Sequence, residues 1–523
     1  MLKHDRTLTA AAVEGLIADG HTIVIFEDYV LKLDSWLSKH PGGRLAILHM
    51  VGKDATDEIK AYHTPATWQT MKAFRIGRKP LGIWANMTPP IRGGIYGKRD
   101  HDQVPPTPPA ASVASSTRPD VTARDIKSDP DAYTEWAESQ EIDRDNARFP
   151  SLDPTVQQDI AQKYRALHQR VHDEGFYKCR HVEYAKELAR YTALFGAFVV
   201  ALRSEWYLTS AVFLGLFWHQ IMFTAHDAAH GAITGNFEVD SLIAMFVGDF
   251  CCGLSIGWWK SSHNVHHLIT NHPEHDPDIQ NVPLFATSPS FFRSIHSSYY
   301  RFTFVWDAAA NVLVPYQKYT YYPVMCIARF NLYLLSWLHV LSVRSSALGS
   351  SKAWWIRPVE ILFMSCYWYL FGYLLVWCSL PTWPVRIAFV LVSHIVTMPL
   401  HVQITLSHWG MSTSEVGESE SFAQRQLRTT MDVDCPAWLD WIHGGLQFQA
   451  VHHLFPRVPR HNLRRLQVLV REFCASTGIP YTLLGFVDGN AKVLGRLGEV
   501  GQQVKHLVEC QKFMAATGAS GLH

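Results

Sequence analysis

Histidines that cluster at helical spacing are the residues most able to do chemistry in this chain of 523 residues. Seven of its 28 histidines fall into three short clusters. Residues at i, i+3 and i+4 of a helix share one face, so the imidazoles within each of the first two clusters point together. Imidazole nitrogen is a good ligand for iron, zinc and copper. The clusters are His226-Asp227-Ala228-Ala229-His230, His263-Asn264-Val265-His266-His267 and Gln449-Ala450-Val451-His452-His453.

The number of histidines indicates two metal ions rather than one. A structural zinc ion uses four ligands, whereas the three clusters offer seven imidazoles. The sequence has no Glu-x-x-His motif, which carboxylate-rich di-iron bundles require, and no His-Glu-x-x-His helix of the zinc-protease type. The clusters therefore predict a dinuclear site dominated by nitrogen ligands, with structural histidines or bound zinc as the alternative.

A second pattern, near the N-terminus, predicts a haem site. His40-Pro41-Gly42-Gly43 is followed by Tyr62-His63, so two histidines stand 23 residues apart beside a turn with little side-chain bulk. Two imidazoles on opposite faces of a porphyrin would fill both axial positions of the iron. Such a haem passes single electrons and does not bind oxygen, so another centre must carry out the chemistry.

The elements that hold these residues divide the chain into four expected parts. Thr22–Phe26 and Tyr29–Leu33 are expected strands of a compact haem domain, residues 1–85. The proline-rich residues 86–130 predict an extended, flexible linker. Residues 131–475 would form a membrane domain that carries the histidine clusters, and residues 476–523 a cytosolic tail. Because the N-terminus lacks the apolar core of a secretory signal, we expect the haem domain in the cytosol.

Apolar segments long enough to cross a bilayer surround the clusters. A spanning helix needs about 20 mostly apolar residues, and Trp206–Phe223, Ile361–Val385 and Ile387–Gly410 meet this requirement. Tyr191–Leu202 is shorter, and we expect it to cross as a hairpin with Trp206–Phe223. Leu332–Val343 is amphipathic and too short to be a good span.

The clusters must meet on one side of the membrane, which constrains the topology. Leu242–Trp259 separates the first two clusters and contains Asp249, so we expect it to lie at the interface or to re-enter without crossing. The expected fold is multi-domain: a small α+β haem domain and an all-α membrane domain with four transmembrane helices and a cytosolic helical cap. The net charge of +1 gives no reason to expect nucleic acid as a partner. The low charged fraction of 18% suits a chain that contacts the lipid bilayer.

These motifs carry a resemblance to two known families. Residues 20–80 resemble a cytochrome b5 domain, with His40 and His63 at the axial-ligand positions and with Asp54, Asp57 and Glu58 as the acidic rim that such domains present to redox partners. The clusters HDxxH, HxxHH and QxxHH resemble the histidine boxes of membrane-bound fatty-acyl and sphingolipid desaturases. Gln449 at the start of the third box, together with the haem domain, resembles the front-end subgroup. Within this subgroup the chain is most similar to fungal Δ8 sphingolipid desaturases.

The resemblance implies cofactors and roles for single residues. It implies haem b on His40 and His63 and a di-iron centre on the histidines of the boxes, with O2 as co-substrate. His408 matches an additional ligand of the family, and Gln449 would bind iron weakly or hydrogen bond a bound oxygen species. Asp227, Asp276 and Asp278 are expected to orient ligating imidazoles. Three further histidines are expected to face solvent or to support the ligands: His272, His275 and His443.

The implied activity is the O2-dependent introduction of a double bond, at the Δ8 position, into the long-chain base of a sphingolipid or ceramide. Because the chain lacks a Rossmann fingerprint, electrons from NADH would arrive through a separate cytochrome b5 reductase. The implied location is the endoplasmic reticulum membrane, with the haem domain and the boxes on the cytosolic side. The alternatives are a front-end Δ5/Δ6-type fatty acyl desaturase, a lipid hydroxylase on the same scaffold, and a membrane-anchored haem electron carrier.

Overall fold

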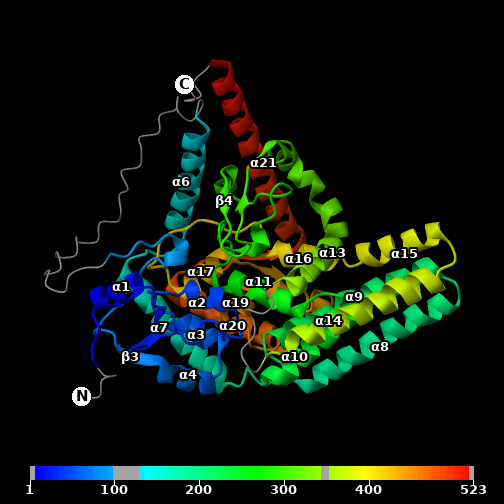
Figure 1. The fold of residues 1–523 in the computed structure, drawn as a ribbon, viewed down its shortest axis with the longest axis horizontal. Helices are drawn as coiled ribbons and strands as arrows, with labels where there is room; N and C mark the ends of the chain where they lie inside the picture. Colours follow the sequence, from blue (N-terminus) through cyan, green and yellow to red (C-terminus); the bar gives the residue numbers. More distant parts are fainter. Residues whose placement is uncertain (1–5, 98–128, 343–352, 518–523) are drawn as a thin grey trace.

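The computed structural model describes residues 6–97, 129–342 and 353–517. Its N-terminal part is an antiparallel three-stranded sheet with strand order β1-β2-β3, covered by four short helices (Figure 1). Alternate side chains of β1 enter two cores: Ile23 and Ile25 pack with α1, whereas Val24 and Phe26 pack with Ile47 of α2. The bounds are β1 Ile23–Phe26, β2 Tyr29–Lys32, β3 Arg75–Arg78, α1 Ala10–Ala18, α2 Arg44–Leu48, α3 Thr56–Tyr62, α4 Pro65–Met71 and η1 Lys72–Phe74.

Both expected strands of the haem domain are confirmed by β1 and β2. Of the expected linker, residues 98–128 lie outside the described residues. The part before them packs against the rest of the molecule and includes η2, Pro90–Arg92. Asn86 accepts a hydrogen bond from the backbone N–H of Asp54 (2.8 Å) and donates one to the carbonyl of Glu418 (3.0 Å).

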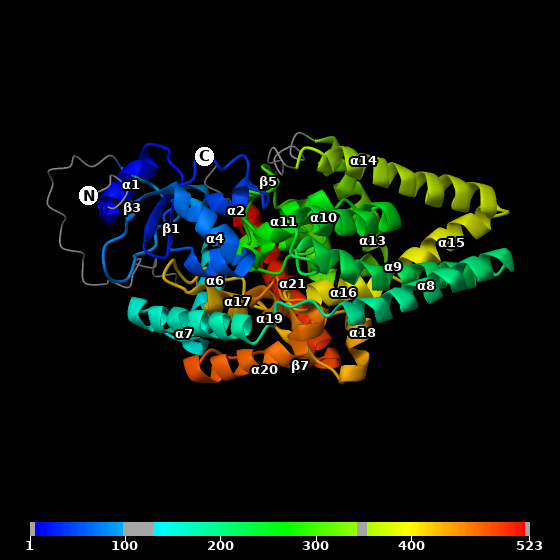
Figure 2. The ribbon, with the colours of Figure 1, turned by 90° about the horizontal axis from the view of Figure 1, so that it is seen from below.

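Four long helical segments project side by side from the rest of the molecule (Figures 1 and 2). The first two, α8 and α9, pack together as the expected hairpin. The outward side chains of all four segments are apolar and exposed, as expected for contact with lipid. Examples that are each more than half exposed are Val200, Leu208, Leu362 and Ile387. The segments are α8 His181–Arg203, α9 Tyr207–Ala229, α14 Ile356–Tyr367 continued by η8 Trp368–Ser379, and α15 Trp383–Ile395 followed by α16 Met398–Leu406.

Length and composition identify four candidate membrane spans in the described ranges, but they differ from the expected set. Tyr207–Ala229, Ile356–Ser379 and Trp383–Leu406 correspond to three expected spans. The fourth candidate is Ala308–Leu341, whereas α8, which contains Tyr191–Leu202, is not among them. Leu332–Val343 was expected to be too short for a good span, but its described part belongs to a longer helix, α13 (Gln317–Leu341), which begins 15 residues before Leu332 and lies within this fourth candidate.

The helix α13 leaves the projecting bundle and packs against α11, α16 and α21 (Figure 1). Its inner face carries polar side chains such as Gln317, Arg329 and Ser336, and its outer face exposes Leu334 and Leu338. An apolar outer face of this kind suits contact with lipid.

The segment Leu242–Trp259 does not form one straight span. α10 (Phe237–Met245) continues into η3 (Phe246–Cys251), and α11 (Ile256–Leu268) then turns away by 116°. The buried carboxylate of Asp249 accepts a hydrogen bond from the backbone N–H of Ile256 (2.8 Å), which begins α11. With this bend the first and second histidine clusters meet: the ring centroids of His226 and His263 lie 5.5 Å apart.

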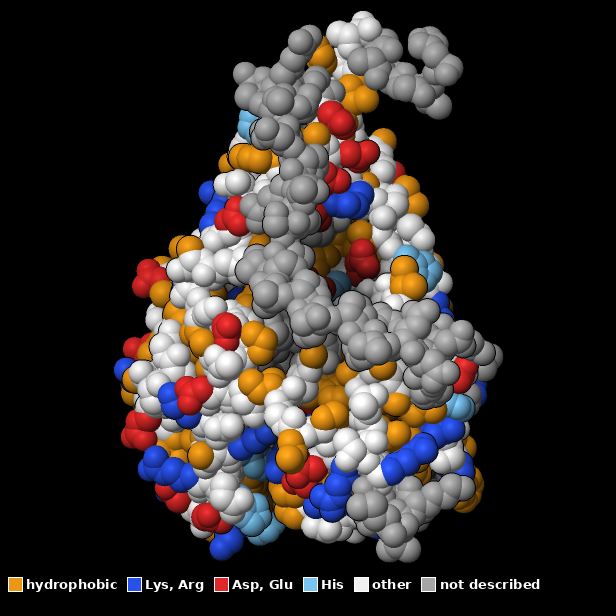
Figure 3. All heavy atoms as spheres, turned by 90° about the vertical axis from the view of Figure 1, so that its left-hand side faces the viewer, with side chains coloured by type: hydrophobic (Ala, Val, Ile, Leu, Met, Phe, Trp, Pro, Cys, Tyr) orange, Lys and Arg blue, Asp and Glu red, His pale blue; other side chains and the backbone are white. Residues whose placement is uncertain are grey.

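The remaining helices form a cap around the inner ends of the bundle (Figure 2). Within the cap, β6 pairs in parallel with β7. Figure 3 shows the end of the molecule opposite the bundle, where acidic and basic side chains are interspersed. The elements are α6 Pro130–Arg148, α7 Pro154–Asp173, η4 Pro277–Ile279, η5 Pro289–Phe292, β4 Ile295–His296, β5 Thr303–Phe304, α12 Ala308–Leu313, η6 Val314–Tyr316, α17 Phe422–Thr429, β6 Asp432–Asp434, η9 Ala437–Leu439, α18 Asp440–His443, η10 Leu446–Phe448, α19 Gln449–Leu454, α20 Arg460–Thr477, β7 Leu483–Gly485 and α21 Phe486–Thr517.

The acidic cluster of the haem domain binds this chain's own cap. Arg165 of α7 donates to Asp57 (2.6 Å) and lies 3.8 Å from Asp54. Asp57 is buried, and burial raises its pKa to about 6, against the opposite effect of Arg165. The expectation that these carboxylates form a free rim for a separate partner is therefore corrected for Asp54 and Asp57: here the partner is α7.

Candidate haem site and metal centre

The two predicted haem ligands face each other. His40 precedes α2 and His63 directly follows α3, and their ring centroids lie 5.9 Å apart. Each Nδ1 donates to a nearby backbone carbonyl, His40 to Gly43 and His63 to Ile59, both at 3.0 Å. Burial lowers the pKa of His40 and lowers that of His63 to about 3, so both rings are neutral. Each ring therefore keeps Nε2 as a free acceptor, which fits the axial ligation of a haem iron.

The turn beside His40 has no room for a larger residue. A Cβ at position 42 would meet Cε1 of His40 at 2.8 Å, so Gly42 is required for this ring position. The lack of a side chain at Gly42 thus lets the backbone pack directly against the imidazole of His40.

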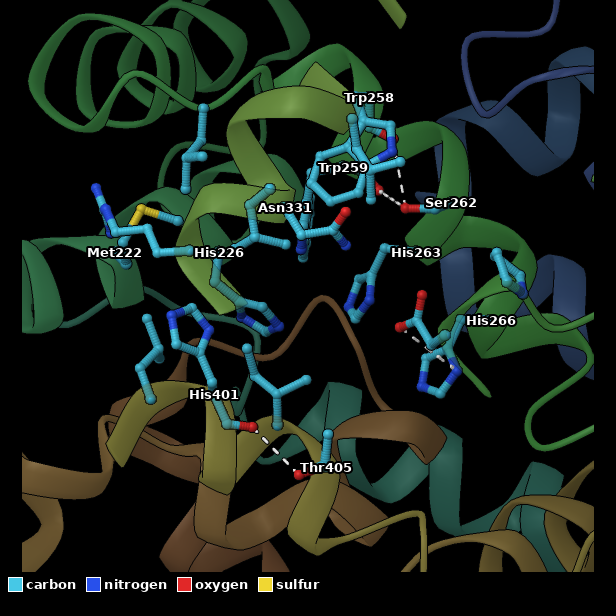
Figure 4. Close-up of a pocket in the computed structure, with 18 of the residues that line it drawn as sticks. Met222, His226, Trp258, Trp259, Ser262, His263, His266, Asn331, His401 and Thr405 are labelled. Atoms are coloured by element: carbon cyan, nitrogen blue, oxygen red, sulfur yellow. Dashed lines mark hydrogen bonds and ion pairs between the residues drawn. The ribbon is translucent and has the colours of Figure 1, made fainter. Parts of the chain in front are cut away.

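The three histidine boxes converge inside the cap. α9 carries His226, and His230 follows its end; α11 carries the second box; α19 carries the third. Ligand atoms of His226, His230, His263 and His452 lie within 4.8 Å of one another, and so do those of a second group, His266, His408 and His453. Figure 4 shows His226, His263 and His266 pointing into one cavity, opposite His401 and Thr405 of α16. Residues from segments far apart in the sequence thus form two adjacent groups of imidazoles.

His267 lies between the two groups. Its Nε2 is 2.9 Å from Nε2 of His263 in the first group, and its ring stacks on His453 of the second at a centroid distance of 4.1 Å. His408, which follows α16, has its ring 4.6 Å from that of His266. The position that resembled an additional ligand therefore lies within the second group.

The chemistry of these nitrogens fits bound metal ions. At this centre, five buried imidazole nitrogens of the boxes and of His408 have no hydrogen-bond partner among the described residues. An unpartnered buried polar atom costs about 1–3 kcal/mol, so five in one cluster favour a bound ligand. Burial, reinforced by neighbouring imidazoles, holds the pKa values of His408, His452 and His453 well below the usual range, so their lone pairs are available. The nitrogens are Nε2 of His230, His452 and His453 and Nδ1 of His267 and His408.

Side chains outside the boxes orient the imidazoles of the second group. Nδ1 of His266 is 2.8 Å from a carboxylate oxygen of Asp276, and Asp278 lies farther away at 3.8 Å. Nδ1 of His453 is 2.9 Å from Oε1 of Gln426, whose amide donates to the carbonyl of His267 (2.8 Å). Each of these contacts leaves Nε2 of the ring free for a metal ion.

Asp227 lies beside His226, as expected of an orienting carboxylate, but it binds other side chains more closely. It is 3.7 Å from Nδ1 of His226, but its closest partners are Arg460 (2.6 Å) and the hydroxyl of Tyr184. Arg460 also binds Glu187, so it joins α20 to α8 and α9 beside the first box. Gln426 and Arg460 were not predicted from the sequence, because a single amide or arginine in an amphipathic helix carries no distinguishing pattern.

An apolar cavity of about 240 Å³ lies beside both groups. Gln449 lines it together with His226, His263, His266 and His408, so its side chain is placed among the imidazoles as the third box suggested. Most of the remaining wall is apolar: Met222, Phe223, Leu254, Ile256, Trp258, Trp259, Leu332, Leu335, Leu400, Ile404 and Leu446. An elongated apolar group could therefore reach the imidazoles.

The three spare histidines are not solvent-facing. His275 is buried and stacks on His272 (4.3 Å between ring centroids) and beside His49 of the haem domain (5.0 Å). His443 is buried too, with Nδ1 3.2 Å from the amide nitrogen of Gln403. His272 and His275 therefore lie at the contact with the haem domain, and His443 packs within the cap.

Comparisons with known proteins agree with this geometry. Residues 204–485 match the model of the family "Fatty acid desaturase", and residues 9–79 match "Cytochrome b5-like Heme/Steroid binding domain". The chain is 49% identical to "Delta 8-(E)-sphingolipid desaturase" of Emericella nidulans, with 99% of each chain covered. It is 44% identical to the protein of that name from Kluyveromyces lactis, covering 97% of this chain and 95% of the relative. It is 31% identical to "Delta(8)-fatty-acid desaturase" of Helianthus annuus, covering 91% and 88%. This chain therefore belongs to the fatty acid desaturase family and carries a cytochrome b5-like domain ahead of its desaturase domain.

Proposed function

We propose that the chain is an O2-dependent desaturase that introduces a Δ8 double bond of E geometry into the long-chain base of sphingolipids such as ceramides. The observation that carries the proposal is the convergence of two imidazole groups on an apolar cavity, beside a docked haem domain. The lipid class and the bond position come from the names of the fungal relatives, which match this chain over nearly its whole length.

In this proposal the histidines form three sites, one for the haem and one for each of two iron ions. His40 and His63 hold haem b. His226, His230, His263 and His452 hold one iron, while His266, His408 and His453 hold the other. His267 lies between the two groups, and Gln449 faces the cavity as a weak ligand or a hydrogen-bond partner. When bound, the iron pair supplies the dioxygen-dependent oxidation that removes two hydrogens from adjacent methylenes, and the haem supplies the two electrons singly.

The chain itself holds the methylenes and excludes water. Trp258 and Trp259 form one wall of the cavity, and Leu400 and Ile404 of α16 form part of another. An apolar wall binds an alkyl chain without specific polar contacts, so orientation must come from the shape of the cavity. The cavity lies between α9, α11, α13 and α16, next to the lipid-facing elements, so the reactive chain can enter from the membrane while a polar head stays at its surface.

We further propose that the protein resides in the endoplasmic reticulum membrane, with the haem domain and the boxes facing the cytosol. A haem with both axial positions occupied accepts electrons one at a time. A separate NADH–cytochrome b5 reductase is the proposed source of these electrons.

Lipid profiling of an expressing strain tests the proposal. The chain would be produced in a yeast lacking its own desaturases of this type, and both long-chain bases and fatty acids would be analysed. We expect a new Δ8 base and unchanged fatty acids. A matched strain that expresses His266→Ala should contain no new base. New double bonds in fatty acids alone would identify an acyl desaturase, hydroxylated lipids would identify a hydroxylase, and no product from a protein that binds haem but no iron would identify an electron carrier.

A further inference from the structure

The haem site and the metal centre touch through one aromatic side chain. Tyr62 is the last residue of α3 and is bonded directly to His63, a haem ligand in the proposed function. Its ring meets the ring of His267 edge-on, with centroids 6.1 Å apart and an interplanar angle of 85°. A single residue thus spans the distance between the two cofactor sites.

His267 connects this contact to both groups of imidazoles. Its ring centroid lies 5.0 Å from that of His230 and 4.8 Å from that of His452 in the first group. It lies 4.1 Å from His453 in the second group. His267 is therefore in ring contact with members of both imidazole groups.

The docking of the two domains fixes the position of Tyr62. On one side, Asp57 of the same helix is bound by Arg165. On the other, the amide of Asn264, next to His263, donates to the carbonyl of Gly42 beside His40 (3.3 Å). The ring itself packs against the buried apolar cluster that includes Tyr164, Val451 and Phe455. The contact between Tyr62 and His267 is therefore part of a packed interface.

We propose that Tyr62 is the electronic contact between the haem and the metal centre. In each transfer the haem iron is oxidised from the ferrous to the ferric state, and the metal centre gains that one electron through His63, Tyr62 and His267. Tyr62 is neither oxidised nor reduced overall, and two transfers supply one double bond. Tunnelling rates fall exponentially with the length of any gap between contacting atoms, so removal of the ring slows the transfer. The inference rests on the proposed function and adds the route that its electrons take.

Two substitutions separate the ring from its surroundings. Tyr62→Met fills much of the space with a flexible chain but removes the ring. Tyr62→Phe keeps the ring and is the matched control, because the buried hydroxyl of Tyr62 has no hydrogen-bond partner among the residues that the structure describes. Haem and iron contents of both purified holoenzymes would be measured first.

The test follows the absorbance of the reduced haem after rapid mixing with O2 and lipid substrate. We expect the haem of Tyr62→Met to be oxidised about tenfold more slowly than in the unaltered protein, and that of Tyr62→Phe at an unchanged rate. Oxidation of the haem of Tyr62→Met at the unaltered rate, with full iron, would overturn the proposal. An equally slow Tyr62→Phe would also overturn it, because the hydroxyl would then carry the effect.

A single-turnover experiment excludes a merely structural role. Enzyme with a chemically reduced metal centre does not need the contact, so Tyr62→Met should form as much product per iron as the unaltered protein. Less product per iron would show that Tyr62 supports the metal centre itself, which would overturn the proposal. The readout is independent of the lipid class: if the unaltered enzyme desaturates fatty acids instead of sphingolipid bases, the same comparison is made with that substrate.

Discussion

The haem site and the metal centre orient their histidines in different ways. At the haem site, Nδ1 of His40 and of His63 bind backbone carbonyls three and four residues away. At the metal centre, His266 is oriented by Asp276, ten residues away, and His453 by Gln426, 27 residues away. One site is built by a turn and a helix end, and the other by the packing of whole helices.

Because of this difference, we expect the two sites to tolerate different side-chain substitutions. Backbone carbonyls cannot be removed by a side-chain substitution, so the haem site depends mainly on its own ligands. The metal centre depends on side chains from α9, α11, α17, α19 and α20, each of which can be altered alone.

Loss of a ligand should disable one site and leave the other intact. His452→Ala removes a member of the first imidazole group, and we expect no desaturated product but a normal haem spectrum. His63→Ala should abolish haem binding while iron content stays unchanged. Haem spectra, iron analysis and product profiles check both variants, and substantial product from His452→Ala would argue that the boxes are structural.

Loss of Arg460 should destabilise the metal centre specifically. Arg460→Met leaves the carboxylates of Asp227 and Glu187 buried without their cation, which costs about 3–5 kcal/mol. The temperature of thermal unfolding and the iron content should both fall, whereas the haem spectrum should not change. Arg464→Met on the same helix is the control, since its ion pair with Asp440 is about one-third exposed and is worth at most about 1 kcal/mol. Equal losses in the two variants would refute this account of Arg460.

Loss of an orienting carboxylate should weaken the metal centre more moderately. Asp276→Asn removes the charge that faces Nδ1 of His266, and we expect iron affinity to fall about 10–100-fold. Asp278→Asn, at a carboxylate 3.8 Å from the same nitrogen, should have a smaller effect. Chelator competition measures both affinities, and a larger effect of Asp278→Asn would reverse the assignment.

Acid should weaken the packing between the haem domain and α7. His168 of α7 contacts Trp68 of the haem domain, and burial, with Lys60 nearby, lowers its pKa to about 4. The unfolded chain takes up this proton at a higher pH than the folded protein, so the contribution of His168 to stability falls as the pH drops below about 6.5 and levels off below about 4. The loss between about pH 7 and 5.5 should be about 1 kcal/mol. Melting temperatures over this range should fall less in His168→Gln, and an identical pH dependence would exclude His168 as the cause.

Local patterns explain what the sequence could predict. The haem ligands and each histidine box lie within one turn or one short helix, so their residue types and spacing are visible in a single stretch. The strands β1 and β2 and the hairpin of α8 and α9 follow from equally local patterns.

Tertiary contacts explain what it could not predict. Arg460 and Asp227 are 233 residues apart, and Arg165 and Asp57 are 108 apart. Nothing local marks such pairs, so Asp57 was expected at a free rim. The apolar runs of α13 are interrupted by Arg329 and Asn331, which made Leu332–Val343 look too short to be a candidate span.

The rate of haem oxidation at different protein concentrations tests the central claim, that the docked haem domain feeds the metal centre of its own chain. Reduced holoenzyme would be mixed with O2 and lipid substrate over a tenfold range of protein concentration. We predict a first-order rate constant that is independent of concentration and a much slower oxidation in His452→Ala. A rate constant that rises in proportion to protein concentration, or an unchanged rate in His452→Ala, would contradict the account.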